Sequence, residues 1–491
     1  MLRVIKLREV ILCIFSAILL SLSFPKIELW FFAWFGLIPL MLVLDQKTPW
    51  AAFRSAYFCG VIFFAITMYW FIHVTLVGAI LAISYLALYF GIFGFAYRYF
   101  KDKKSIEKLF LLPSVWVALE FFRAHLLTGF DWASLGQSQY KILPVIQMAD
   151  ITGMFGVSFI LVMVNFCLKE ILQGKKDKAV IFSTGILIAT ILFYGLFSLQ
   201  QIHSFRKISV AIIQGNIPQS VKWDESAWPA IMKKYLALTK KAVAQKPDLM
   251  IWPETSFPGF LWRDQESLKD LNDFVHRENV PLLFGSILEE KGHYYNAAIL
   301  LSGQAQVVGE YKKIHLVPFG EFLPLRSVFP FLSDIVPIAD FTAGKEDTLL
   351  PLKLEKNYSF SVLICFEDTV AYLSREFVNR GSQLLINLTN DAWFADSKEP
   401  FLHLQSAVFR AIENRRSLVR SANTGVSCFI DPLGRITRYV QNDRQKKTFV
   451  DGYAVEQVEL NTQKTFYTKF ADVFTYLCFG CILLAFRWKR E

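Results

Sequence analysis

Three segments of this 491-residue chain lead, through a strand-like run, to a residue type that can take part in covalent chemistry. Residues 359–364 first alternate between polar and apolar side chains and then become apolar, and Cys365 follows them directly. Residues 248–253 form a second apolar run, which Glu254 follows directly. Residues 309–313 are a short strand-like run that closes with a lysine pair. A carboxylate that accepts a thiol proton, a thiolate that attacks a carbonyl carbon and a cation that stabilises the oxyanion are the parts of thiol-dependent acyl transfer. Each residue by itself has another interpretation: Cys365 could be a buried cysteine of the core, and Glu254 could be an exposed carboxylate on a loop.

These segments resemble the Glu-Lys-Cys constellation of the nitrilase (carbon-nitrogen hydrolase) superfamily. The surrounding residues are similar to one family within it, the apolipoprotein N-acyltransferases, which N-acylate bacterial lipoproteins at a membrane. The similarity lies in Trp-Pro-Glu at 252–254, His-Leu-Val-Pro-Phe-Gly-Glu at 315–321, Asn-Asp-Ala-Trp-Phe at 390–394 and Gln-Gly-Asn-Ile-Pro-Gln at 214–219. It implies that Glu254 is the base, Cys365 the nucleophile and Lys313 the cation, because the family lysine stands two residues before the histidine of 315–321. Lys312 is then a lysine on a solvated turn.

The resemblance also implies which groups support this triad. Glutamates at the positions of Glu321 and Glu367 lie in or next to the site in the family, where they orient Lys313 or help to move protons; the alternative for both is a structural carboxylate. The main-chain N–H of Phe366 completes the oxyanion hole. The family often has tyrosine at this position, so a ring hydroxyl is not expected to act here.

Four further residues match family positions around the site. Trp223 matches a tryptophan that lies near the site in the family. The alternative is that Trp223 is an aromatic residue that only packs in the core. Asn390 and Trp393 follow a predicted core strand and are expected to shape the rim. Arg123, together with residues 128–132, is expected to meet lipid headgroups, since a cation beside a phosphate is favourable.

The reaction implied by the resemblance has two steps. Cys365 takes an acyl chain from a phospholipid as a thioester, and the α-amino group of a diacylated apolipoprotein then attacks that thioester. A membrane-tethered amidase of the nitrilase type, which passes the acyl group to water, is the alternative, and a transporter with an accessory domain is a third class. The scarcity of ionisable residues inside the spans, apart from Glu120 and Arg123, argues against transport. We find no zinc spacing, Walker loop or dinucleotide fingerprint and expect no cofactor or metal.

Residues 322–341 form an apolar segment interrupted by three prolines. Proline argues against a helix or a central strand, so we expect a loop. An apolar loop just after the catalytic lysine suggests a lid that dips into lipid, with Phe329, Phe331 and Leu332 in contact with acyl chains. The alternative is a loop that packs on its own domain.

Composition predicts a multi-span α-helical membrane domain joined to a soluble one. The chain is 54% hydrophobic and only 19% charged, against roughly a quarter charged in average soluble domains. Eight apolar stretches lie near the length of about 20 residues that crosses a bilayer. They are 8–24, 28–44 (short, with Pro39), 54–73, 76–98, 109–127, 151–171, 179–199 and 470–486. We therefore expect a transmembrane domain at 1–200, a catalytic domain at 203–467 and a last helix with a tail at 468–491.

Basic residues predict the orientation of these spans. They cluster at 3–8, 47–54, 98–108, 169–178 and 487–490, which are alternate ends of the spans. By the positive-inside rule both termini are cytoplasmic and the 203–467 domain lies in the periplasm, with the spans in the bacterial inner membrane. A cleaved signal peptide is disfavoured because further spans follow the first. The net charge of +10 is then a topology signal and not a nucleic-acid site. We expect a monomer whose partners are the bilayer, a phospholipid acyl donor and a diacylated apolipoprotein.

The catalytic domain alternates short strands with helices, which indicates an α/β fold. Helices are predicted at 227–244, 265–278, 370–379 and 401–414, and strands at 208–214, 249–252, 282–286, 296–301, 306–311, 359–364, 384–388, 418–430 and 436–440. The resemblance implies that these form a nitrilase-like α-β-β-α sandwich. Cys365 and Cys428 are the two cysteines of this domain, and a disulfide between them is the alternative to a core strand at 425–430.

Overall fold

The structure, a computed structural model, describes residues 7–201, 205–318, 320–322 and 340–487. The chain divides into two compact units. The helical unit comprises Met1–Ile202, Ser397–Gln405 and Thr465–Glu491, and the sheet unit comprises His203–Asp396 and Ser406–Lys464. The carboxy-terminal helix therefore packs with the amino-terminal helices, although the sheet unit separates them in the sequence.

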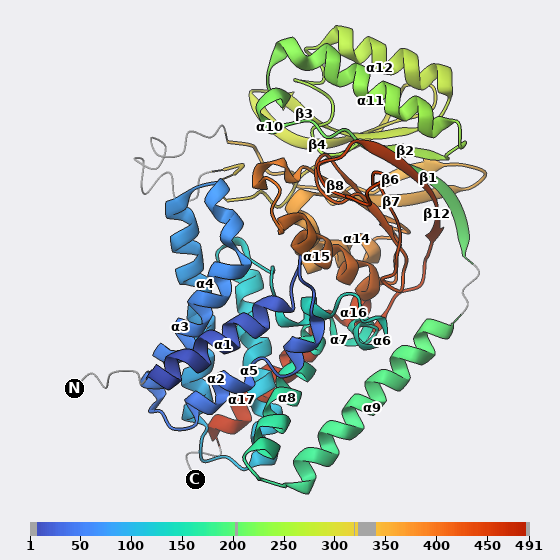
Figure 1. Ribbon diagram of the computed structural model, residues 1–491. Coiled ribbons are helices and arrows are strands. Elements are labelled where there is room, and N and C mark those ends of the chain that lie inside the picture. Colours follow the sequence, from blue (N-terminus) through green and yellow to red (C-terminus); the bar gives the residue numbers. More distant parts are fainter. Residues whose placement is uncertain (1–6, 202–204, 319, 323–339, 488–491) are drawn as a thin grey trace. The chain divides into compact units, whose positions relative to one another are not determined.

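The helical unit contains long apolar helices joined by short ones (Figure 1). Its described elements are α1 Leu7–Leu22, η1 Trp30–Trp34, α2 Ile38–Leu44, α3 Pro49–Thr67, η2 Tyr69–His73, α4 Leu76–Tyr99, α5 Ser105–His125, η3 Leu126–Thr128, η4 Leu135–Gln139, α6 Leu143–Ile146, α7 Ala149–Thr152, α8 Met154–Leu172, α9 Lys178–Gln200, α16 Phe466–Phe470 and α17 Val473–Arg487. The starts of α3 and α9 follow ordinary capping chemistry. Thr48 accepts from Ala51 N with Pro49 at the first helical position, and Asp177 accepts from Ala179 N.

Five of these helices are long and apolar enough to cross a membrane, namely α3, α4, α5, α8 and α9. They correspond to five of the eight predicted spans. The predicted span at 28–44 is wrong as a single helix, because it divides into η1 and α2. Pro39 stands at the start of α2 and cannot continue an earlier helix, since it lacks an N–H. The seven residues of α2 rise about 10 Å, a third of a bilayer core of about 30 Å. The predicted spans at the two ends of the chain are the 16-residue α1 and the 15-residue α17.

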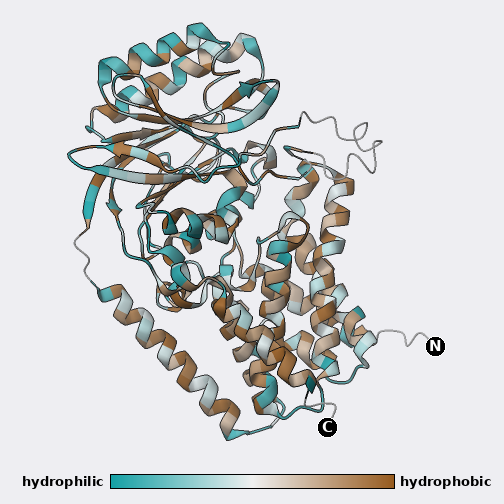
Figure 2. Ribbon diagram, turned by 180° about the vertical axis from the view of Figure 1, so that it is seen from behind, coloured by the Kyte–Doolittle hydropathy of each residue, from teal (hydrophilic) through white to brown (hydrophobic). Residues whose placement is uncertain are grey.

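Large apolar side chains cover the outward faces of the long helices. Figure 2 shows that hydrophobic residues predominate along these helices, whereas hydrophilic residues are frequent on the helices of the sheet unit. Exposed examples on α4 and α9 are Leu76, Val77, Ile80, Leu81, Phe182, Phe193, Leu196 and Phe197. Soluble monomers rarely expose contiguous apolar surface of this kind, so these faces suit a lipid environment.

The sheet unit is built on two six-stranded sheets (Figure 1). The first has the order β12-β1-β2-β3-β4-β5 and the second β11-β10-β9-β8-β7-β6. The strands are β1 Arg206–Gln214, β2 Leu249–Ile251, β3 Leu282–Glu290, β4 His293–Leu301, β5 Val307–Lys312, β6 Leu350–Lys353, β7 Asn357–Ile364, β8 Leu385–Thr389, β9 Leu418–Ala422, β10 Cys428–Ile430, β11 Ile436–Tyr439 and β12 Gly452–Leu460. In each sheet three central strands are parallel, β1-β2-β3 and β7-β8-β9, and the flanking pairs are antiparallel.

The period-two pattern of the strands explains the layering. Ile208, Val210 and Ile212 of β1 join residues of β7, β8 and β9 in one core between the sheets, whereas Ala211 and Ile213 join a second core with α11 and α12. The helices are α10 Gln219–Lys222, η5 Glu225–Ala227, α11 Trp228–Val243, α12 Gln265–Glu278, η6 Cys365–Thr369, α14 Ala371–Asn379, η7 Asp391–Phe394 and α15 Glu399–Asn414, whose residues after Gln405 belong to this unit. With α14 packed on the second sheet, the predicted α-β-β-α sandwich is confirmed.

Candidate active site

Cys365 is the first residue after β7, at the carboxyl end of a parallel strand. Its φ of +53° lies in the left-handed region, which costs a residue other than glycine about 1–3 kcal/mol and turns the chain sharply into η6. The Asn387 side chain on the neighbouring β8 donates to the Cys365 carbonyl at 3.1 Å and ties this turn to the sheet. The thiol is therefore presented at a rigid strand end.

Glu254 reaches the same place from the loop after β2. This loop lies against β3, where the Gly285 N–H donates to Pro253 O at 3.1 Å. A Cβ at Gly285 would stand 2.4 Å from Thr255 N and 2.7 Å from Glu254 Cα, so only glycine permits this approach. The loop is thus held close to the strand that backs it, and the Glu254 side chain is buried.

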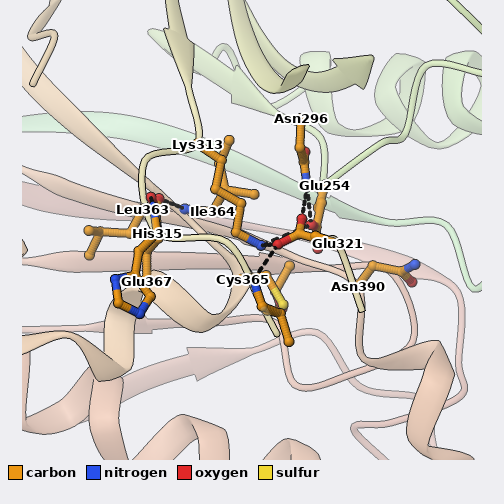
Figure 3. Close-up of polar contacts among 12 residues, drawn as sticks. Glu254, Asn296, Lys313, His315, Glu321, Leu363, Ile364, Cys365, Glu367 and Asn390 are labelled. Carbon is orange, nitrogen blue, oxygen red and sulfur yellow. Dashed lines mark hydrogen bonds and ion pairs between the residues drawn. The ribbon is translucent and has the colours of Figure 1, made fainter. Parts of the chain in front are cut away.

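Lys313 follows β5 directly, and its side chain meets two buried carboxylates (Figure 3). The Lys313 Nζ lies 2.8 Å from Glu321 Oε2 and 3.9 Å from Glu254 Oε1. The Asn296 side chain on β4 links the two carboxylates, since its Nδ2 donates to Glu254 Oε1 at 2.7 Å and to Glu321 Oε1 at 2.8 Å. Figure 3 shows the side chains of Lys313, Glu254, Glu321 and Cys365 converging on one another. Three segments that each follow a strand, after β2, β5 and β7, and the strand β4 therefore build a single cluster.

The two lysines of the pair lie in different surroundings. The Lys313 side chain is 1% exposed, whereas Lys312 points to the surface and pairs with Glu290 at 2.7 Å and Glu310 at 3.4 Å. Successive residues at a strand end point to opposite faces, which explains the difference. Lys313 alone of the two can act on a group at Cys365.

Glu367 holds the loop of Lys313 against the strand of Cys365. Its carboxylate accepts hydrogen bonds from the N–H groups of Ile314 at 2.7 Å, His315 at 2.9 Å and Ile364 at 2.7 Å, and from the Tyr311 hydroxyl at 2.8 Å. These donors come from the end of β5 and the end of β7. One buried carboxylate thus fixes the spacing between the two chain segments that carry the lysine and the thiol.

Burial and neighbouring charges set the protonation of the cluster. Burial raises the pKa of Glu254, although Lys313 opposes the shift. Burial and Glu254 raise the pKa of the Cys365 thiol well above its usual range, and Lys313 opposes this too. Burial would lower the pKa of Lys313, but Glu321, Cys365 and Glu254 outweigh it and raise the pKa. The resting cluster is therefore a thiol beside a permanent cation, with a carboxylate more basic than usual to take the thiol proton.

Three other residues predicted for the site belong to the sheet unit. Phe366 is buried and its ring stacks on His315 with centroids 5.8 Å apart. Asn390 donates to Gln219 Oε1 at 3.0 Å and accepts from Asn423 at 2.9 Å, so it ties together loops from β8, β9 and α10. Trp393 is 54% exposed in η7.

Trp223, which follows α10, is 47% exposed and is therefore not a core packing aromatic. Arg123 belongs to the helical unit, where it is buried and donates to Ser134 Oγ at 2.6 Å. The residues proposed for the lid, Phe329, Phe331 and Leu332, lie outside the described residues. Cys428 lies in β10, and neither Cys428 nor Cys365 is in a disulfide, so the alternative of a disulfide between them is wrong.

Two family models match the chain. The first, described as the apolipoprotein N-acyltransferase N-terminal domain, covers residues 16–167, and the second, carbon-nitrogen hydrolase, covers residues 209–462. The apolipoprotein N-acyltransferase of Geobacter metallireducens is 36% identical, over 99% of this chain and 96% of that protein. The chain belongs to the apolipoprotein N-acyltransferase family. The enzyme of the same name from Chlorobaculum tepidum is 30% identical, over 95% of this chain and 93% of its own length.

This chain is therefore an enzyme of the apolipoprotein N-acyltransferase family, within the nitrilase superfamily, and a membrane protein. Among solved structures, an amidase from a Nesterenkonia species is similar to 57% of this chain over 98% of its own length. The identity is 16% and the TM-score 0.41.

Two residues that contact Glu254, Asn296 and Lys222, were not predicted from the sequence as part of the site. Asn296 stands in β4 between aromatic and apolar neighbours, and a polar residue at an inward strand position was the available signal. Lys222 precedes Trp223 and is buried, with its Nζ donating to Glu254 O at 3.1 Å. Neither contact follows from spacing, because Glu254 lies 42 residues from Asn296 and 32 from Lys222.

Proposed function

We propose that this chain is an apolipoprotein N-acyltransferase that works through a thioester on Cys365. The observation that carries the proposal is the convergence of Cys365, Lys313 and Glu254, from three separate strand ends, in one buried cluster. A thiol with a raised pKa is a poor nucleophile until a base removes its proton, and Glu254 is the base within reach.

In the first half-reaction Glu254 accepts the Cys365 proton as the sulfur attacks an ester carbonyl of a phospholipid. The new S–C bond places a negative charge on the carbonyl oxygen, which the Lys313 ammonium and the Phe366 N–H stabilise. The C–O bond to the glycerol then breaks. The leaving alkoxide takes the proton from Glu254 and departs as a lysophospholipid.

In the second half-reaction the free α-amino group of a diacylglyceryl-cysteine apolipoprotein attacks the thioester carbonyl. Glu254 accepts a proton from the attacking nitrogen, and the C–S bond breaks as the amide forms. The Cys365 thiolate recovers the proton from Glu254. The same carboxylate thus serves as base and acid in turn, which a pKa raised towards neutrality favours.

We also propose that the chain is a monomer in the bacterial inner membrane, with both termini cytoplasmic and the catalytic domain in the periplasm. The clusters of basic residues at alternate ends of the apolar stretches support this orientation. Substrates that are both lipids suit an enzyme with lipid-facing helices.

Intact-protein mass spectrometry tests the proposal. Purified protein mixed with phosphatidylglycerol in detergent micelles should gain the mass of one acyl chain, and peptide mapping should place it on Cys365. Cys365→Ala should gain none. Acylation at another residue, or an equal gain by Cys365→Ala, would refute the thioester assignment.

A further inference from the structure

The buried side chain of Lys222 has no part in the reaction described so far. Lys222 ends the short helix α10 and is 5% exposed. A lysine is almost never buried without an anionic partner. Among the described residues, however, the Lys222 Nζ has a single hydrogen bond, to the main-chain oxygen of Glu254 at 3.1 Å. Its burial beside the base therefore calls for a reason.

The charges of the cluster supply one. Glu254 and Glu321 are two buried carboxylates, and among the described residues they share a single ion-paired cation, Lys313. When both carboxylates are ionised, Lys313 alone leaves the cluster with one net negative charge. A buried uncompensated charge is strongly unfavourable, so a second cation within electrostatic reach would stabilise the ionised form.

Lys222 meets this requirement. Among the described residues, Glu254 and Cys365 both raise the pKa of Lys222, so both favour the charged form of its amine. These are the two groups between which the proton moves in the first half-reaction. An ammonium beside both compensates the negative charge whether it resides on the carboxylate or on the sulfur.

We propose that Lys222 is a second cation of the active site, a positioning residue that fixes the Glu254 loop and balances the charge of Glu254 and Cys365 while it stays protonated. The proposal rests on the thioester mechanism and adds to it a residue that the triad does not contain. The uncharged amine would keep the hydrogen bond to Glu254 O but lose the charge balance. Acylation should therefore depend on the protonation of Lys222.

The pH range follows from its surroundings. Burial lowers the pKa of Lys222 to about 8, although Glu254 and Cys365 oppose the shift. Lys313, with its raised pKa, keeps its charge over the same range. The rate of acylation should thus fall as pH rises through about 8.

The experiment measures single-turnover acylation of Cys365 by phosphatidylglycerol between pH 6 and 10 with the full-length protein in micelles. This half-reaction contains no amine nucleophile, and phosphatidylglycerol has no amine to titrate. Lys222→Met removes the charge and the donor, whereas Lys222→Arg keeps a charge that does not titrate in this range. Lys241→Met, at an exposed position in α11, is the control.

Wild type and Lys241→Met should show the alkaline fall. Lys222→Met should react about tenfold more slowly near pH 7 and show no fall, since a charge acting at a distance contributes less than a direct oxyanion donor. Lys222→Arg should recover most of the rate and extend it above pH 8.

Three results would overturn the proposal: a wild-type rate without an alkaline fall, a normal rate in Lys222→Met, or a slow Lys222→Met that keeps the wild-type alkaline fall. The last result would assign Lys222 a structural role only. If the variants do not fold, the pH dependence of the wild-type acylation rate still tests the proposal, because a rate without an alkaline fall contradicts it. Absence of any acyl adduct on wild-type Cys365 would instead count against the thioester mechanism.

Discussion

Replacing Asn296 with alanine tests whether the bridge between Glu254 and Glu321 controls the base. The Asn296 Nδ2 donates to both carboxylates, at 2.7 and 2.8 Å, and a hydrogen bond of this kind favours the ionised carboxylate. A hydrogen bond to a charged group contributes about 1.5–3 kcal/mol. Losing the bond should therefore raise the pKa of Glu254. Since about 1.4 kcal/mol is a factor of ten in an equilibrium, the loss should lower the fraction of ionised base on the acid side of the titration by about ten- to a hundredfold.

The sign of the effect on activity follows directly. Glu254 must be ionised to accept the thiol proton, so acylation is lost as pH falls through its pKa. That pKa is already raised by burial in the wild type, and Asn296→Ala should move the acid limb of the rate further towards neutral pH. Near the plateau of the profile the two proteins should differ much less.

The assay is single-turnover acylation of Cys365 by phosphatidylglycerol from pH 4.5 to 8, with thermal unfolding measured in parallel. Asn357→Ala is a matched control, because Asn357 is also a strand asparagine but is exposed. If folded Asn296→Ala keeps the wild-type acid limb, the hydrogen-bonded bridge does not tune the base and the reasoning is wrong.

Three more predictions concern neighbouring residues. Lys313→Met should slow acylation by at least about 10²–10³-fold, whereas Lys312→Met, at the surface, should react near the wild-type rate; equal damage would contradict the division between them. Glu367→Gln should lower the free energy of unfolding by about 1–3 kcal/mol in denaturant titrations near pH 5, because an amide cannot accept all the bonds that the carboxyl oxygens accept. Burial raises the pKa of Glu367 to about 7. The favourable contribution of Glu367 to the free energy of unfolding of the wild type should therefore fade as pH rises from about 4 to about 7. If Glu367→Gln shows the same pH dependence of stability as the wild type, Glu367 is not its source. Cys428→Ala should keep its acylation rate, since Cys428 is a free thiol in a core strand, and an inactive but folded variant would require a second role for it.

The fold was predictable where local sequence determines local structure. The predicted helix 265–278 has the bounds of α12, because Asp264 caps its start and Asn279 ends it in a left-handed conformation. The strand ends at Glu254 and Cys365 were predictable for a similar reason, since an apolar run stops at each of them. The α-β-β-α layering required the family resemblance, because alternating strands and helices indicate only an α/β fold.

What the sequence could not predict depends on contacts between distant segments. Asn296 reaches Glu254 only because β4 pairs with β3 in one register, and the Lys222 contact depends on where α10 places its last residue. Pro39 marked the predicted span 28–44 as short, but its division into η1 and α2 was not predicted, since apolar composition continues on both sides of the proline. The composition of a stretch shows how apolar it is, but it does not show where a helix within that stretch begins or ends.

The central claim is that a thioester on Cys365 passes its acyl chain to an amine. The direct measurement isolates the acyl-enzyme formed with phosphatidylglycerol, removes the donor, and follows loss of the adduct with and without a diacylated lipopeptide that has a free α-amino group. We predict that the adduct persists in buffer and is discharged rapidly by the lipopeptide, with an N-acylated lipopeptide as the product. Discharge by water at the same rate, with release of free fatty acid, would contradict the account and favour an amidase.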